Sequence, residues 1–256
     1  MHVISLTSDL GYKDHYLGTL KALILNRAEQ YVQFIEVNNR IPSYDIVRAA
    51  YAVKNTYTSF PVPSIHLVLI SNYYNSKPSL LVFKKEGHFF IIPDNGLLNL
   101  IFPDFKSSVR RVDIEVYKGP NSVYEAYAQI CAYIIQGGSL GKLGKRTQSY
   151  AKGLGLMPVI ENKRLRATVI HVDIYGNVVI NVDRELFEKI VGNEDFSIYY
   201  KQRDPIKNMS KSYASVDVGE VLAWFNSSDL LEIAVNMGDA STLLGLKRDD
   251  LIQIEF

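Results

Sequence analysis

The stretch Val3-Ile-Ser-Leu-Thr-Ser-Asp-Leu-Gly11 decides the fold. Its first four residues are apolar enough for a buried strand, and the strand ends at Asp9-Leu-Gly11. A helical pattern of apolar residues follows from Leu17 to Ile24. A strand that ends on an acid and leads into a helix places a carboxylate at the edge where open α/β sheets bind ligands. Asp9 is therefore predicted to accept hydrogen bonds from a vicinal diol such as that of a ribose, and the alternative is that it caps the following helix.

Composition narrows the class of protein. A chain of 256 residues with 47% hydrophobic residues forms one large domain or two small ones with a real core. The net charge of +1 and the scattered basic residues argue against nucleic acid as a partner. Cys131 is the single cysteine, Met1-His2 leads straight into a strand, and no apolar run reaches the roughly 20 residues of a membrane span. We therefore expect a cytoplasmic protein without a membrane partner.

Residues 1–150 are predicted to form an α/β domain with a largely parallel sheet. Ser43 is expected to cap the second helix, and the short turn 84–87 predicts a hairpin. The predicted strands cover 3–6, 32–37, 65–70, 80–83 and 89–92, and the later helices cover 44–54 and 123–135.

Residues 160–256 are predicted to form an antiparallel β-barrel-like domain, because short alternating runs and turn residues replace the helical patterns. Short helical stretches are expected near Leu186 and Leu243, and residues 142–158 are expected to link the domains. The predicted strands cover 166–172, 177–182, 196–201, 220–225, 231–235 and 251–255.

Several polar motifs each predict a turn when they are considered alone. Asp173-Ile-Tyr-Gly-Asn177 and Asn226-Ser-Ser-Asp229 have the composition of hairpin turns, and Pro93-Asp-Asn-Gly96 has that of a tight turn. Tyr213 lies in a polar stretch, where it is expected either to stack on a base or to cover a strand.

Taken together and in order, these motifs resemble the S-adenosylmethionine hydroxide adenosyltransferase family, whose superfamily contains the fluorinase and the chlorinase. The resemblance implies an N-terminal α/β domain, a C-terminal β-barrel-like domain and a homotrimer. It also implies an adenosyl site between the N-terminal domain of one subunit and the C-terminal domain of its neighbour. The motifs that carry it lie at 7–14, 41–45, 93–98, 173–177, 226–227 and 231–238.

The resemblance also implies roles for individual residues. Asp9 matches the acid that holds the ribose hydroxyls, Tyr44 lies where the halogenases place a tryptophan against the sugar, and Asp173 matches the acid that meets the methionine ammonium. Asn177 matches an amide near the adenine, and Tyr213 matches an aromatic residue that stacks on it. The full set of candidate substrate-binding residues is Asp9, Tyr44, Asn95, Asp173, Tyr175, Asn177, Tyr213, Asn226, Ser227, Val235 and Met237.

The catalytic residues of the resembling family are replaced in this sequence. Its hydroxide-transferring members use an Asp, an Arg and a His, whereas Ser71 stands at the position of the Asp and Tyr124 at that of the His. A substitute set is conceivable, in which Glu125 acts as a base for water, Tyr124 orients the water and Lys77 replaces the arginine. The alternative is that Glu125 only favours the start of its helix through the helix dipole.

Three functions are therefore open. The first is an enzyme that cleaves S-adenosylmethionine with water to adenosine and methionine. The second is a catalytically lapsed protein that binds S-adenosylmethionine or adenosine, and the third is adenosyl transfer to another nucleophile fitted to the loop 73–75. The expected ligand is a small adenosyl compound, and neither a cofactor nor a metal is expected.

Overall fold

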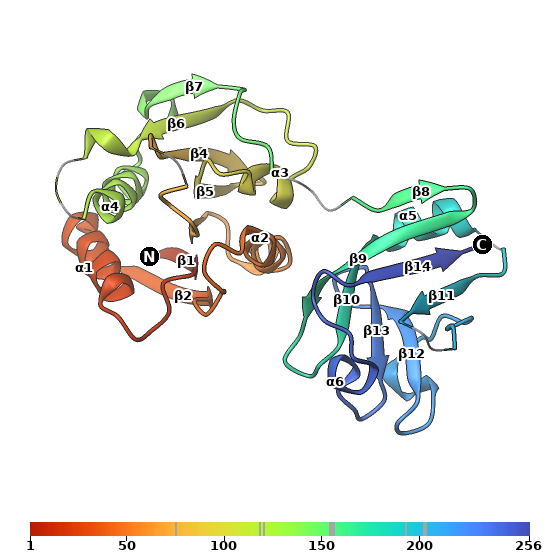
Figure 1. The fold of residues 1–256 in the computed structure, drawn as a ribbon. Helices are drawn as coiled ribbons and strands as arrows, with labels where there is room; N and C mark the ends of the chain where they lie inside the picture. Colours follow the sequence, from red (N-terminus) through yellow and green to blue (C-terminus); the bar gives the residue numbers. More distant parts are fainter. Residues whose placement is uncertain (75, 118, 120, 154–156, 193, 202–203) are drawn as a thin grey trace. The chain divides into compact units, whose positions relative to one another are not determined.

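The computed structural model describes residues 1–74, 76–117, 119, 121–153, 157–192, 194–201 and 204–256. The chain divides into two compact units, Met1–Gly155 and Leu156–Phe256 (Figure 1). The first is an α/β unit built on a mixed sheet, and the second is built on a curled antiparallel sheet. The predicted fold class is confirmed.

The first unit contains a sheet with the strand order β2-β1-β3-β5-β4-β6-β7. Strands β2, β1, β3 and β5 run parallel, and β4, β6 and β7 join antiparallel. Because β1 pairs with both β2 and β3, its C-terminal end lies between theirs. The strands are β1 (His2–Ser8), β2 (Val32–Asn38), β3 (Ser64–Leu69), β4 (Ser79–Lys85), β5 (His88–Pro93), β6 (Val109–Asp113) and β7 (Lys145–Thr147).

Helices cover both faces of this sheet. Helices α1 (Tyr16–Ala28) and α4 (Ser122–Ile135) pack together on one face, and α2 (Ile46–Lys54) and α3 (Leu97–Ile101) pack together on the other (Figure 1). Strand β3 is buried on both of its faces. Leu67 and Leu69 belong to the core under α1 and α4, whereas Val68 belongs to the core under α2 and α3.

Three local predictions for the first unit were wrong or incomplete. Asp45, and not Ser43, is the N-cap of α2, because its carboxylate accepts a hydrogen bond from the backbone N–H of Arg48 at 2.9 Å. Strand β7 lies within the stretch that was expected to be a linker, and β6 was not predicted. Gly155 of the expected linker and Asn75 of the loop 73–75 lie outside the described residues.

The second unit contains the strand order β11-β14-β9-β10-β13-β12, with β8 paired to β9. Period-two alternation assigns each side chain of β13 to a face: Leu231 and Ile233 point into the core, and Glu232 lies on the opposite face. The elements are β8 (Val159–Glu161), β9 (Arg164–Val172), β10 (Val178–Asp183), α5 (Arg184–Val191), β11 (Ser197–Tyr200), β12 (Val221–Phe225), β13 (Leu230–Val235), α6 (Ala240–Leu244) and β14 (Leu251–Glu255).

Among the described residues, no helix combines the length and the apolar character that crossing a bilayer would require.

Candidate active site

Asp9 follows β1 and joins two loops of the first unit. Its Oδ2 accepts hydrogen bonds from the backbone N–H of Tyr44 at 3.1 Å and from that of Ser71 at 3.2 Å. The other carboxylate oxygen forms no hydrogen bond within the described part of the chain. One oxygen therefore organises the site, and the other is left for a ligand. The alternative that Asp9 caps α1 is wrong, because α1 begins at Tyr16 and His15 is its N-cap.

The two backbone donors have an unusual conformation. Tyr44 has φ 68° and Ser71 has φ 50°, which is the left-handed region that residues other than glycine seldom adopt. Such a conformation costs on the order of 1 kcal/mol or more, and it persists where the surroundings hold it. Both residues donate to Asp9, so the carboxylate holds both loops at its own position. No sequence pattern indicated these conformations.

A cavity of about 490 Å³ opens beside Asp9. This volume falls within the range of small-molecule sites, which span roughly 300–1,000 Å³. The cavity brings together Asp9, Tyr44, Ser71 and Tyr124, which the sequence analysis had placed at the site. Its full lining is Asp9, Leu10, Tyr16, Ser43, Tyr44, Ser71, Asn72, Tyr73, Asn121, Val123 and Tyr124.

Tyr124 contributes a hydroxyl that stays protonated at neutral pH. Burial raises the pKa of Tyr124 to about 12, and the nearby Tyr16, Tyr73 and Asp9 add to the effect. A phenol with this pKa donates a hydrogen bond and is not a general base. Tyr124 can therefore orient a water molecule or a ligand oxygen, as the substitute set required.

Asn72 is a buried polar residue of the cavity that sequence reasoning missed. The hydroxyl of Tyr127 shares its one hydrogen between two acceptors, the side-chain oxygen of Asn72 at 2.9 Å and the backbone oxygen of Val68 at 2.6 Å. Tyr127 is fully buried in α4. The amide of Asn72 is therefore held in a fixed position at the cavity by a residue that is distant in the sequence.

Glu125 does not take part in this cavity. Its carboxylate forms an ion pair with the guanidinium of Arg27 at 2.6 Å, and it lines a different cavity together with Val116, Tyr117 and Gln129. Successive residues of a helix point about 100° apart, so Tyr124 and its neighbour face different surroundings. Glu125 lies in the first turn of α4. The geometry favours the alternative of a helix-start residue, and a role for Glu125 as the base stays a prediction.

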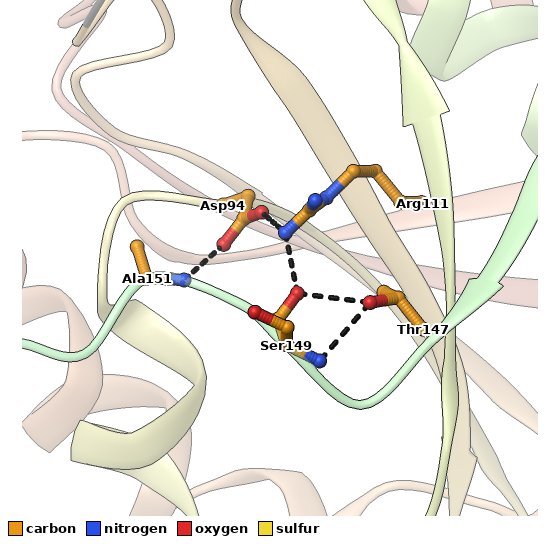
Figure 2. Close-up of polar contacts among 5 residues, drawn as sticks. All are labelled: Asp94, Arg111, Thr147, Ser149 and Ala151. Carbon is orange, nitrogen blue, oxygen red and sulfur yellow. Dashed lines mark hydrogen bonds and ion pairs between the residues drawn. The ribbon is translucent and has the colours of Figure 1, made fainter.

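The motif Pro93-Asp-Asn-Gly96 anchors a loop and does not line the cavity. The side chain of Asn95 donates to the backbone oxygen of Ile70 at 2.9 Å. Figure 2 shows that Asp94 accepts from Arg111 at 2.5 Å and from the backbone N–H of Ala151 at 2.7 Å. The same guanidinium donates to the backbone oxygen of Ser149 at 2.6 Å. These contacts hold Ser149 and Ala151 beside Asp94 and Arg111. The expected contact of Asn95 with a substrate stays a prediction.

The candidate residues of the second unit form a cluster of their own. Oδ1 of Asp173 accepts from the backbone N–H groups of Tyr175 at 2.9 Å and Asn177 at 2.8 Å, so the motif forms the turn expected from its composition. The amide nitrogen of Asn177 donates to Oδ2 of Asp173 at 3.0 Å and to the hydroxyl of Tyr213 at 3.3 Å. That hydroxyl donates to Glu232 at 2.8 Å. Asp173, Asn177 and Tyr213 are therefore brought together.

The other candidates of the second unit lie in turns or, for Val235, at the end of β13. Asn226 closes the hairpin between β12 and β13, and its amide nitrogen donates to Glu232 at 3.0 Å. The backbone oxygen of Val235 accepts from Gly238 at 3.0 Å. The side chains of Tyr175, Ser227 and Met237 are exposed. Glu232 was missed by sequence reasoning, although an acid between core residues of a strand is a recognisable pattern.

Models of known protein families match most of the chain. Residues 4–144 match the SAM hydroxide adenosyltransferase N-terminal domain, and residues 167–253 match the C-terminal domain of the same family. The chain belongs to this family. The (R)-S-adenosyl-L-methionine hydrolase of Methanocaldococcus jannaschii is 29% identical, with 99% of this chain and 96% of that protein covered. A protein of the same name from Thermus thermophilus is 23% identical, with 96% and 97% covered.

Two solved structures have the same fold as this chain. The crystal structure of an uncharacterized conserved protein from Thermotoga maritima superposes with a TM-score of 0.85 and 27% identity, covering 99% of this chain and 100% of that one. A conserved hypothetical protein from Thermus thermophilus superposes with a TM-score of 0.76 at 21% identity, with 99% and 100% covered.

Proposed function

We propose that this chain hydrolyses S-adenosylmethionine to adenosine and methionine. The observation that carries the proposal is the free carboxylate oxygen of Asp9 at the edge of a ligand-sized cavity, in a chain of this family. Two relatives that match nearly the whole chain bear the name of a hydrolase of this compound. The ligand is a small adenosyl compound, and the reaction as written requires neither a cofactor nor a metal.

In the proposed reaction a water oxygen attacks C5′ of the ribose in line with the bond to sulfur. The O–C5′ bond forms, the C5′–S bond breaks, and its electron pair leaves with sulfur as the neutral thioether of methionine. The proton of the attacking water passes to solvent. Because the leaving thioether is neutral, positioning supplies most of what the reaction needs. Asp9 holds the ribose hydroxyls, and Tyr124 and Asn72 orient the water.

A catalytically lapsed binding protein is the second candidate function. The observation that favours it is the ion pair of Glu125 with Arg27, which removes the one carboxylate that had been suggested as a base. Transfer to another nucleophile remains a third candidate, since Tyr73 of the loop 73–75 lines the cavity. Both alternatives keep the binding of an adenosyl ligand.

Two substitutions in α4 test the proposal. We expect Tyr124→Phe to slow adenosine formation at least about tenfold, because it removes a hydrogen-bond donor that is fixed at the reacting centre. Glu125→Gln is the matched control, and we expect it to leave the rate unchanged because its carboxylate faces Arg27. Chromatography of adenosine and methionine after incubation with S-adenosylmethionine measures both rates.

The outcomes of this assay separate the candidate functions. Absence of the Asp, Arg and His set predicts slow turnover, because losing a general base costs about 10²–10⁴-fold in rate. Binding without any adenosine would favour the lapsed protein over the hydrolase. A larger loss in Glu125→Gln than in Tyr124→Phe would place the reacting centre at the cavity beside Arg27 and contradict the proposed site.

We further propose that the active form is a closed homotrimer in which the two clusters of candidate residues come from different subunits. The support is the resemblance to the family and the division of these residues between the units, with Asp9 in one and Asn177 in the other. Light scattering is expected to give the mass of three chains. Mixing Asp9→Asn and Asn177→Ala chains is expected to restore part of the binding that each variant lacks. A monomer mass at micromolar concentration would contradict the shared site.

A further inference from the structure

Glu232 is a buried acid at the centre of the cluster in the second unit. Its side chain is 3% exposed, and it lies on the face of β13 that points away from the core. Oε1 accepts from the hydroxyl of Tyr213 at 2.8 Å and from the indole N–H of Trp224 at 2.8 Å, and Oε2 accepts from Asn226 at 3.0 Å. Within the described residues Glu232 forms no ion pair with a Lys, Arg or His.

Each of these three contacts has a fixed direction. The indole of Trp224 can only donate. The amide of Asn226 presents its N–H₂ to Glu232, because its oxygen already accepts from the backbone N–H groups of Ser228 at 2.9 Å and Leu230 at 3.3 Å. Both oxygens of Glu232 accept hydrogen bonds, which a carboxylate can do and a carboxamide cannot. A glutamine at this position would therefore point its N–H₂ group at one of the three donor side chains.

The hydrogen bond from Tyr213 to Glu232 also determines how the side-chain amide of Asn177 is oriented. Because the hydroxyl hydrogen of Tyr213 goes to Glu232, its oxygen accepts from the amide nitrogen of Asn177. The other hydrogen of that amide goes to Asp173, which as a carboxylate only accepts. Both hydrogens are used, and the carbonyl oxygen of Asn177 forms no hydrogen bond within the described part of the chain. Asn177 is only 6% exposed, so this acceptor is held in one orientation.

We propose that Glu232 is a positioning residue that fixes Asn177 as a hydrogen-bond acceptor and thereby makes the site select 6-amino purines over 6-oxo purines. An amino group donates to the carbonyl oxygen of Asn177. A 6-oxo group would place two acceptors face to face and leave both unpaired. The inference rests on the proposed function, since it takes the ligand to be an adenosyl compound whose base lies at Asn177.

The test compares the binding of adenosine and inosine by calorimetry. We expect the natural chain to prefer adenosine by about tenfold to a hundredfold, as for a site whose buried polar group is left unpaired by the wrong ligand. Glu232→Gln is expected to lose most of this preference. Glu188→Gln, which changes an exposed acid of α5, is expected to keep it. Trp224 is the one tryptophan of the chain, so its fluorescence reports whether the cluster has rearranged.

A second variant keeps the inference testable if Glu232→Gln does not fold. Tyr213→Phe removes the hydroxyl that connects Glu232 to Asn177, and it is expected to reduce the preference for adenosine as well. If both variants weaken adenosine and inosine equally, the preference does not depend on Glu232 and the inference is overturned. If the natural chain binds S-adenosylmethionine but shows no preference between the nucleosides, only the inference fails. If it binds none of the three, the proposed function fails with it.

Discussion

Replacing Asp9 by asparagine is expected to weaken the binding of S-adenosylmethionine about 30-fold or more, which corresponds to about 2 kcal/mol of lost charged hydrogen bonds. Asparagine has the shape of aspartate, and its single oxygen can still accept from the backbone N–H groups of Tyr44 and Ser71. Its amide nitrogen then replaces the oxygen that is free for the ribose hydroxyls. Isothermal titration calorimetry measures the change.

The controls for Asp9 separate the ligand contact from the loop contacts. Asp14→Asn changes an exposed acid of the same segment and is expected to bind as the natural chain does. Asp9→Ala removes the loop contacts as well, so it is expected to bind no better than Asp9→Asn and to lower the thermal stability. Equal affinity in the natural chain and Asp9→Asn would show that the ribose is held elsewhere.

Acid is expected to destabilise the first unit through His66. This histidine is buried in β3 with its Nδ1 2.7 Å from the hydroxyl of Ser5 and its Nε2 3.3 Å from Nδ1 of His88. Burial and the neighbouring His88 lower the pKa of His66 from 6.5 to about 3, and burial lowers the pKa of His88 too. Below pH 6.5 the unfolded chain therefore binds a proton that the folded chain does not. The free energy of unfolding should fall by about 2 kcal/mol between pH 6.5 and pH 5 from His66 alone.

Urea denaturation at a series of pH values checks this expectation. The natural chain and His15→Gln, which changes an exposed histidine, should show the same dependence on pH. His66→Gln should be less stable at pH 7 but lose less stability on acidification, because the other groups titrate alike in both chains. Parallel pH curves for the natural chain and His66→Gln would assign the acid sensitivity to other groups.

Much of the fold could be predicted because local patterns determine it. The mostly apolar stretch 65–70 indicated a strand that is buried on both faces, and the alternating runs after residue 160 indicated an antiparallel sheet. The same patterns could not show that β7 pairs with β6, because Lys145–Thr147 is short and polar and is a strand only through its partner.

The site was predictable where it follows from strand order and not where it depends on side-chain direction. Asp9 could be placed at the edge of the sheet from the sequence, because the end of a strand is visible in the residues next to it. The sequence left two roles open for Glu125, because adjacency to Tyr124 does not show in which direction its side chain points from the helix. Asn72 was missed because the residue that fixes it, Tyr127, is 55 positions away. Glu232 could be recognised only as an acid between core residues of a strand, and the structure was needed to show that Tyr213 and Asn226 donate to it.

The proposed hydrolysis of S-adenosylmethionine is tested most directly by running the reaction in water labelled with heavy oxygen and weighing the products by mass spectrometry. Attack of water at C5′ predicts adenosine that carries one heavy oxygen atom in its 5′-hydroxyl, together with unlabelled methionine. Tyr124→Phe should form the same labelled adenosine more slowly. Adenosine without the label, or no adenosine from a folded chain that binds the compound, would contradict the account.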